Sequence, residues 1–257
     1  MFAAAAATRL NRLGIHYGWV MVGLTFLVSV CTSAAVSLPG VLLVPMTEEF
    51  GWGRGAVSGA MGVMFSIFAL MAPFAGALMI RYGLRRVVST ATVMAVAAVI
   101  GLTQVITPWQ VWTCLALLGG AAGMVALVLS ATVANRWFAE RRGLVMGMLT
   151  AAFAAGQLTF LPAAAALANS YGWRIAILPA IIGLALCATL YLLFARDWPA
   201  QVGLAPYGAK AITPPPAASA NNVVTLSLSI LAESLRNRVF WILAGTFFIC
   251  GLSSTGI

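Results

Sequence analysis

Charged residues are scarce in this sequence, and acidic residues are scarcer than basic ones. Only 7% of the 257 residues are charged, with 14 Lys and Arg against 5 Asp and Glu, whereas 62% are hydrophobic. So little polar surface cannot cover a soluble globule, and the mean hydropathy of +1.02 is typical of a chain held in lipid. The composition therefore predicts a polytopic membrane protein.

Side chains that could carry catalysis are missing from the apolar stretches. The single histidine, His16, lies at the margin of the first stretch, and the single lysine, Lys210, lies in a polar segment. Intramembrane hydrolysis needs a nucleophile with a base or metal ligands, and a retinal Schiff base needs a lysine within a span. We therefore expect no enzyme activity, no cofactor and no proton relay within this region.

Cysteine is also rare, and its spacing argues against a disulfide or a metal site. The four cysteines fall in four different apolar stretches, and no two of them have the CxxC spacing of a metal or redox motif. They are Cys31, Cys114, Cys187 and Cys250. We interpret them as small apolar packing residues, and we predict no bound metal.

Seven apolar stretches separated by polar loops predict seven transmembrane helices. A span needs about 20 residues, and these stretches lack the period-2 alternation of a barrel strand. The predicted spans are 19–45, 55–80, 87–106, 109–135, 143–168, 173–195 and 239–257. The expected fold class is an all-α membrane protein.

The basic residues predict the orientation of these spans, because Lys and Arg near span ends are retained in the cytoplasm. Only Arg54 and Arg174 fall on one side. The others fall on the opposite side: Arg9, Arg12, Arg81, Arg85, Arg86, Arg136, Arg141, Arg142, Arg196, Lys210, Arg236 and Arg238. We expect a bacterial inner (plasma) membrane protein with a cytoplasmic N-terminus. Since the charges lie at membrane boundaries, we expect the lipid bilayer, and not nucleic acid, as their partner.

An internal repeat organises the first six spans. Residues Pro73–Arg85 (PFAGALMIRYGLR) recur 89 positions later as Pro162–Arg174 (PAAAALANSYGWR), with the Pro and the Tyr-Gly-x-Arg in register. Three predicted crossings separate the two copies, and an odd number places the second copy on the opposite face of the membrane. The repeat predicts a six-helix bundle of two inverted three-helix repeats.

Composition divides the chain into three parts. Residues 1–195 are the predicted N-terminal six-helix bundle, and residues 196–238, rich in Pro, Ala, Ser and Asn, are a predicted cytoplasmic linker. Residues 239–257 are the predicted first span of a second bundle. Its 19 residues reach only about 28 Å, so we expect that bundle to be truncated and its C-terminal half to be a missing partner.

The loop between the second and third spans carries a family motif. It reads Gly76, Ile80, Arg81, Tyr82, Gly83, Leu84, Arg85, Arg86. These residues resemble the loop signature of the major facilitator superfamily, in which an Asp stands where this chain has Ile80. With the inverted repeat and the linker, the chain resembles the N-terminal half of such a transporter, whose full form has twelve spans.

Three further segments resemble one subgroup of that superfamily. They are His16–Val20, Phe50–Arg54 and Asn135–Leu144. All three are similar to segments of the monocarboxylate porter and oxalate/formate antiporter group. The resemblance implies secondary active transport of a small organic anion such as a monocarboxylate by alternating access, with or without a coupled proton. The alternative is a homodimeric or non-transporting six-helix module.

The motif also predicts a gate, with one departure from the family. In the superfamily the loop Asp is thought to pair with a basic residue and to help hold the outward-open state, and Ile80 can do neither. The predicted gating residues are Gly76, Arg81, Gly83, Arg85, Arg86 and Glu140. Glu140 is a possible substitute for the missing Asp, or it merely offsets its neighbours Arg141 and Arg142.

Polar residues within the spans are candidates for binding the small-molecule substrate. In the family the first and fourth spans line the central path, and the predicted binding residues are Ser33, Ser37, Ser130 and Gln157. A serine can instead bond to the carbonyl one turn back in its helix. Gln157 is the strongest candidate, because a buried amide must find partners for up to about four hydrogen bonds. No lysine follows Pro39, so the anchoring cation typical of a monocarboxylate porter is missing here.

Overall fold

The computed structural model describes residues 16–209, 211–212 and 223–255. The chain divides into two compact units, Met1–Ala218 and Ser219–Ile257, which are described separately. Arg9, Arg12 and Lys210, which the sequence placed on the basic side, lie outside the described residues.

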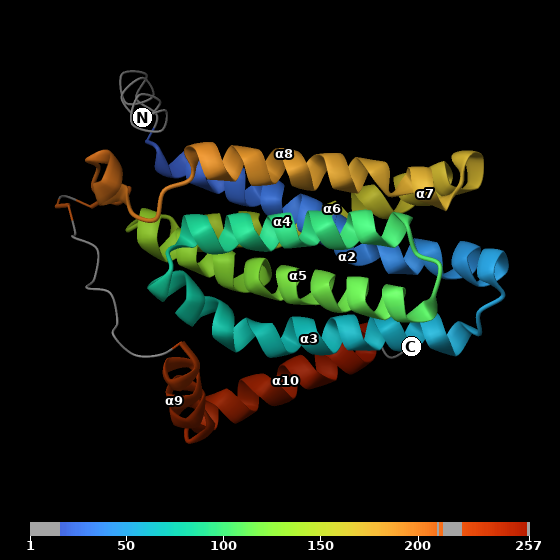
Figure 1. Cartoon of the computed structure of the whole chain (residues 1–257). Helices are drawn as coiled ribbons and strands as arrows, with labels where there is room; N and C mark the ends of the chain where they lie inside the picture. Colours follow the sequence, from blue (N-terminus) through green and yellow to red (C-terminus); the bar gives the residue numbers. More distant parts are fainter. Residues whose placement is uncertain (1–15, 210, 213–222, 256–257) are drawn as a thin grey trace. The chain divides into compact units, whose positions relative to one another are not determined.

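Six apolar crossings make up the first unit, and they run back and forth beside one another (Figure 1). Five are continuous, and the sixth consists of the short α7 followed by α8. At about 1.5 Å per residue, the 20 residues of α4 span about 30 Å, the thickness of a hydrocarbon core. The helices are α2 (Gly18–Phe50), α3 (Arg54–Arg81), α4 (Leu84–Thr103), α5 (Pro108–Trp137), α6 (Arg142–Tyr171), α7 (Trp173–Ala176) and α8 (Leu178–Phe194).

The packing of these helices follows the predicted inverted repeat. The first repeat is α2, α3 and α4, and the second is α5, α6 and α7 with α8. Helix α2 packs on α6 as α5 packs on α3, and α2 packs on α8 as α5 packs on α4. Two further extensive contacts, α2 with α5 and α4 with α8, join equivalent helices. This is the pattern that a two-fold axis in the membrane plane produces, and it confirms the predicted fold class.

The repeated Tyr-Gly builds the same turn twice. Gly83 precedes α4 with φ 86° and ψ 151°, and Gly172 precedes α7 with φ 88° and ψ 156°. Few residues other than glycine adopt this backbone conformation. The sequence repeat therefore specifies the path of the chain at the two ends of the bundle.

The glycine-rich segment of α5 allows close packing in the middle of the bundle. A β-carbon on Gly119 or Gly123 would collide with the backbone carbonyl of Met64 or Phe68, respectively. Helices α3 and α5 thus approach backbone to backbone, as small residues permit in membrane proteins.

The segment that the sequence assigned to a linker contains folded structure. Residues 196–209 follow α8, include the 3₁₀ helix η1 (Pro199–Val202) and are part of the first unit, where Tyr207 bonds to the end of α5. In the second unit, α9 (Val223–Leu235) falls within the predicted linker, and α10 (Arg238–Thr255) covers most of the predicted seventh span. The Pro214–Pro216 run lies outside the described residues, and the three-part division stays a prediction.

Candidate functional site

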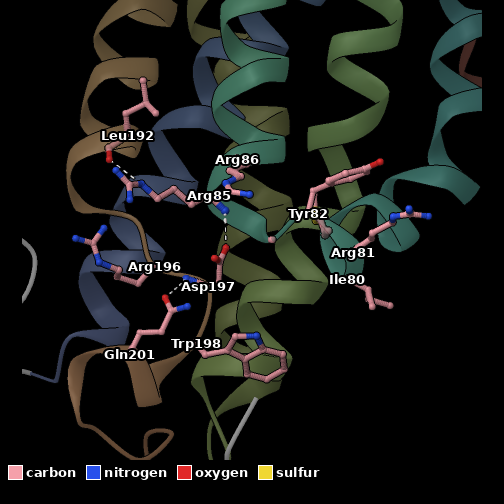
Figure 2. A pocket seen from close by; sticks show the side chains of 12 residues that line it. Ile80, Arg81, Tyr82, Arg85, Arg86, Leu192, Arg196, Asp197, Trp198 and Gln201 are labelled. Carbon is pink, nitrogen blue, oxygen red and sulfur yellow. Dashed lines mark hydrogen bonds between the residues drawn. The ribbon is translucent and has the colours of Figure 1, made fainter. Parts of the chain in front are cut away.

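The two ends of the bundle differ in their charge. We call the end where α3 meets α4 the basic end, because Arg81, Arg85, Arg86, Arg136 and Arg196 lie there; the opposite end is where α6 meets α7. A cavity of about 810 Å³ opens at the basic end. Its lining includes Ile80, Arg81, Tyr82, Arg85, Arg86, Arg196, Asp197, Trp198 and Gln201 (Figure 2). The predicted loop motif therefore borders a cavity of the size that small ligands occupy.

Asp197 is the carboxylate of this cavity. Its Oδ1 accepts a hydrogen bond of 2.8 Å from the backbone N–H of Arg85, in the first turn of α4. A carboxylate here satisfies a free N–H group and favours the positive end of the helix dipole. A side chain at Gly83 would meet this carboxylate at 2.8–2.9 Å, which is a second reason for glycine at that position. The sequence prediction missed Asp197, although an acid just after the sixth span, in a chain with five acids, was a usable signal.

Arg136 joins three parts of the basic end. From the last turn of α5, its Nη2 donates to the carbonyl of Met79, near the end of α3, at 3.3 Å. Its guanidinium also lies over the ring of Trp198, 4.5 Å from the centroid. Such cation–π stacking suits the planar guanidinium. In the sequence analysis Arg136 served only to predict orientation. In the structure it links α3, α5 and the segment after α8.

Glu140, the possible substitute for the missing loop acid, forms no ion pair with Arg85 or Arg86 in the described part of the chain. Its side chain is exposed, and its backbone N–H donates to the carbonyl of Tyr207 at 3.2 Å. The structure shows an ion pair between Glu49 and Arg174, at the opposite end. The gating role of Glu140 and of the motif stays a prediction, and the acid that faces the motif is Asp197.

The segment after α8 is fixed across the basic end. The backbone N–H of Tyr207 donates to the carbonyl of Trp137 at 2.8 Å. His16 Nδ1 accepts from the N–H of Gly18, so its Nε2 carries the proton and donates to the carbonyl of Ala205 at 2.9 Å. These bonds tie the chain after α8 to the segment just before α2 and to the end of α5.

Tyr17 is buried at the same end and bonds to α8. Its hydroxyl donates a 2.6 Å hydrogen bond to the carbonyl of Phe194, at the end of α8. Burial raises the pKa of Tyr17, against the influence of the positive charge of Arg196. The hydroxyl therefore keeps its proton and stays a donor.

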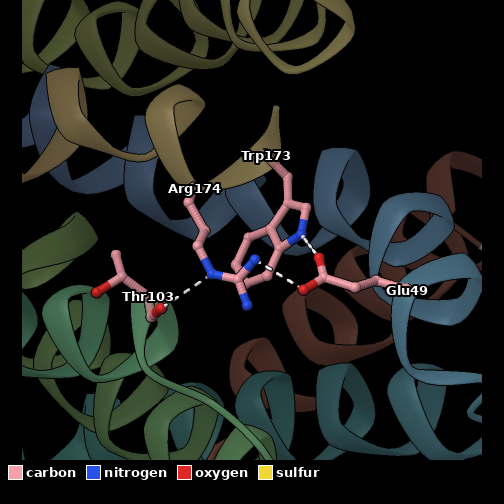
Figure 3. A network of polar contacts seen from close by, with 4 residues as sticks. All are labelled: Glu49, Thr103, Trp173 and Arg174. Atoms are coloured by element: carbon pink, nitrogen blue, oxygen red, sulfur yellow. Dashed lines mark hydrogen bonds and ion pairs between the residues drawn. The ribbon is translucent and has the colours of Figure 1, made fainter. Parts of the chain in front are cut away.

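The opposite end carries a compact polar network (Figure 3). Glu49, in the last turn of α2, accepts from Arg174 Nη1 at 2.8 Å and from the indole Nε1 of Trp173 at 2.5 Å. The Arg174 guanidinium lies over the Trp173 ring, 4.2 Å from the centroid, and its Nε donates to the carbonyl of Thr103 at 3.3 Å. The network joins α2, α4 and α7, and the sequence prediction did not single out Glu49.

The arginines of the two repeat copies make equivalent contacts. Arg85 Nε donates to the carbonyl of Leu192 in α8 at 2.8 Å, and Arg174 Nε donates to the carbonyl of Thr103 in α4 at 3.3 Å. Leu192 follows Thr103 by the same 89 positions that separate the arginines. Each repeat therefore holds the last helix of the other by one arginine, placed where a cation is favoured near a helix C-terminus.

The predicted substrate-binding residues make no hydrogen bonds to one another in the described part of the chain. The hydroxyls of Ser33 and Ser37 donate to the carbonyls of Val30 and Ala34 in their own helix, at 2.9 and 2.7 Å. Ser130 is buried on α5. The amide of Gln157 on α6 is half-buried and has no hydrogen-bond partner among the described residues. The binding role of all four stays a prediction.

Two of the cysteines approach each other, which their sequence spacing did not indicate. The thiols of Cys31 on α2 and Cys187 on α8 lie close to each other, and both are free. Within the described part of the chain, no group of three or more His, Cys, Asp or Glu residues is placed to hold a metal ion.

Comparisons with known proteins agree with this architecture. The sequence profile of the Major Facilitator Superfamily matches residues 25–257. Monocarboxylate transporter 13 of Rattus norvegicus is 24% identical over 162 residues, which are 63% of this chain and 38% of that protein. Monocarboxylate transporter 7 of Homo sapiens is 21% identical over 162 residues, 63% of this chain and 31% of that protein. The matched region thus spans about a third of the length of these relatives.

A solved structure supports the fold. The proton:xylose symporter XylE, bound to 6-bromo-6-deoxy-D-glucose, superposes with a TM-score of 0.58 over 70% of this chain and 45% of that chain. The sequence identity is 15%, so this likeness concerns the fold alone.

Proposed function

We propose that this chain, which belongs to the Major Facilitator Superfamily, forms one bundle of a secondary carrier for a small organic anion such as a monocarboxylate. The chain is an integral membrane protein and a transporter of that superfamily, not an enzyme. The observation that carries the proposed substrate class is the match of 162 residues to monocarboxylate transporters. The loop and entry motifs of the sequence support the same subgroup.

In the proposed mechanism the bundle moves as one wall of an alternating-access carrier. The crossed contacts of Arg85 and Arg174 support this, because each arginine ties one repeat to the last helix of the other. The six spans carry no charged group in their interiors. We infer that the cation for an anionic substrate, and any group that couples a proton, come from a second bundle.

The orientation of the bundle is part of the proposal. Seven described arginines of the first unit gather at the basic end, including Arg141 and Arg142, whereas Arg54 and Arg174 are at the opposite end. The positive-inside rule supports a cytoplasmic basic end and N-terminus in a bacterial inner membrane.

A transport assay tests the substrate class. Uptake of labelled L-lactate, with labelled xylose as the competing substrate class, is measured in proteoliposomes. They contain either the 257-residue chain or the protein encoded by the whole reading frame in which it occurs. We expect saturable lactate uptake by the latter and none by the chain alone, since one bundle forms only one wall of a cavity. Saturable lactate flux by the chain alone supports the homodimeric module instead, and uptake of xylose without lactate contradicts the proposed substrate class.

A matched pair of variants tests the binding role of Gln157. Gln157→Leu removes an amide without a protein partner, so we expect a higher KM for lactate. Gln104→Leu makes the same change at an exposed position after α4, and we expect its KM to be unchanged. Equal KM values for the two variants remove Gln157 from the proposed site.

A further inference from the structure

The cavity at the basic end contains more positive charge than its own acid balances. Four arginines line it, Arg81, Arg85, Arg86 and Arg196, against the one carboxylate of Asp197. Ile80 lines the same cavity and is 49% exposed. It occupies the position at which the family's loop motif has an acid. Like charges that share a cavity raise the local concentration of anions.

Asp197 supplies one negative charge against these arginines, and its carboxylate is held at the start of α4. Its Oδ1 accepts from the backbone N–H of Arg85, and its own N–H donates to Gln201 Oε1 at 3.1 Å. The Arg85 side chain is turned to the carbonyl of Leu192 (Figure 2). Arg196 Nη1 likewise donates to the carbonyl of Ala195 at 2.7 Å. These hydrogen bonds hold the polar groups of the lining in place and leave the positive charge of the arginines uncancelled.

The lining suits the oxygens of a phosphate group. Guanidinium groups bind phosphate through paired N–H donors, and the Gln201 amide can add a neutral donor. The cavity of about 810 Å³ is large enough for a headgroup. Figure 2 shows Arg86, Arg196 and Gln201 around Asp197, while Arg81 and Ile80 lie on the far side of Tyr82.

The position of the cavity favours a lipid over a soluble ligand. It lies at the ends of α3, α4 and α8, where Tyr82 and Trp198 have the place of interfacial aromatic residues. Basic pockets at this depth meet the headgroups of anionic lipids. We propose that the cavity bordered by Arg86 and Arg196 binds the phosphate group of an anionic phospholipid.

Restoring the missing acid gives a direct test. The 257-residue chain is purified in detergent, phosphatidylglycerol is titrated into the micelles, and bound lipid is counted by native mass spectrometry. Ile80→Asp puts a carboxylate into the cavity. This carboxylate would attract the lining arginines and repel the lipid phosphate, so phosphatidylglycerol binding should weaken about fivefold. Ile80→Asn, of nearly equal size and without charge, should bind as the unchanged chain does.

A second matched pair separates the cavity from general attraction to a basic surface. Arg86→Gln removes a charge from the lining, and Arg141→Gln removes one from the same end outside it. We expect the first variant alone to lose affinity. Equal losses for the two, or equal binding by Ile80→Asp and Ile80→Asn, overturn the proposal.

A titration with inorganic phosphate distinguishes a lipid phosphate group from soluble phosphate as the ligand of the cavity. It is titrated against the chain in phosphatidylcholine nanodiscs, and the same variants are compared by thermal unfolding. Stabilisation by phosphatidylglycerol in the discs, with none by inorganic phosphate, supports the lipid. Stabilisation by inorganic phosphate alone, lost in Ile80→Asp, overturns the lipid assignment in favour of a soluble phosphate. No response to either probe overturns the site itself.

Discussion

The two copies of the repeat have the same backbone and different electrostatics. Pro73–Arg85 at the basic end and Pro162–Arg174 at the opposite end share the glycine turn, and each copy holds the other repeat by its arginine. The repeated residues are therefore those that set the path of the chain and the tie between repeats.

Residues outside these two segments, which differ between the two three-helix repeats, set the charge of each end. At the opposite end, the last turn of α2 supplies an acid, Glu49, which pairs with Arg174. At the basic end, the last turn of α5 supplies a base, Arg136, and the acid is Asp197, outside the repeated segments. The position of the first repeat that corresponds to Arg136 is Thr47. The comparison teaches that an inverted duplication preserves geometry while each membrane face acquires its own charges.

The largest effect on stability is expected from variants that replace the glycine of the shared turn. Gly172→Ala should cost about 1–3 kcal/mol, because only glycine adopts this backbone conformation freely. Gly83→Ala meets the same strain and also collides with the Asp197 carboxylate, so we expect a further loss of about 1 kcal/mol as the cap of α4 is displaced. Thermal unfolding in detergent, followed by circular dichroism, measures both variants.

A double variant shows whether Asp197 is the cause of that difference. In an Asp197→Ala background the collision is absent, so Gly83→Ala should cost no more than Gly172→Ala does. If the extra loss persists without Asp197, the two turns differ for some other reason.

An intermediate effect on stability is expected from variants of Asp197, the acid that the basic end has in place of the loop Asp. Asp197→Ala removes the acceptor for the N–H of Arg85 and should destabilise the bundle by about 1 kcal/mol. Asp197→Asn keeps an oxygen at that position, so its loss of unfolding temperature should be smaller. Equal losses for the two variants contradict the capping role and assign the stabilisation to the charge.

Much of the fold could be predicted from the sequence because its signals are local. The length and apolar composition of six stretches gave six helices, with ends that moved by only a few residues, as for α3 at 54–81 against 55–80. The inverted repeat followed from one short duplicated segment and a count of crossings. Folded structure after α8 was not predictable in this way, because residues 196–209 are held by hydrogen bonds to His16, just before α2, and to α5, and no local pattern reveals these bonds.

The candidate site was predicted in part, for a similar reason. Gly83 and Arg85 lie at the basic end where the loop motif placed them, and the motif borders the cavity. Asp197 was missed because it lies 112 positions from Arg85 in sequence and meets it only through the packing of α4 on α8. Glu140 looked like a substitute because it is close to basic residues in sequence, but its described contacts are with Tyr207.

The smallest expected effect tests the ion pair that distinguishes the opposite end. Both partners are well exposed, at 46% for Arg174 and 40% for Glu49, and exposed ion pairs contribute little to stability. Glu49→Gln should therefore lower the unfolding temperature less than Asp197→Ala does. The neighbouring exposed Glu48 gives the control, since Glu48→Gln removes the same charge without breaking an ion pair. Because salt screens exposed charges, with a Debye length of about 3 Å at 1 M, the difference between these two variants should shrink at high salt. A difference that does not change with salt would assign the stabilising contact of Glu49 to the indole N–H of Trp173 instead of to Arg174.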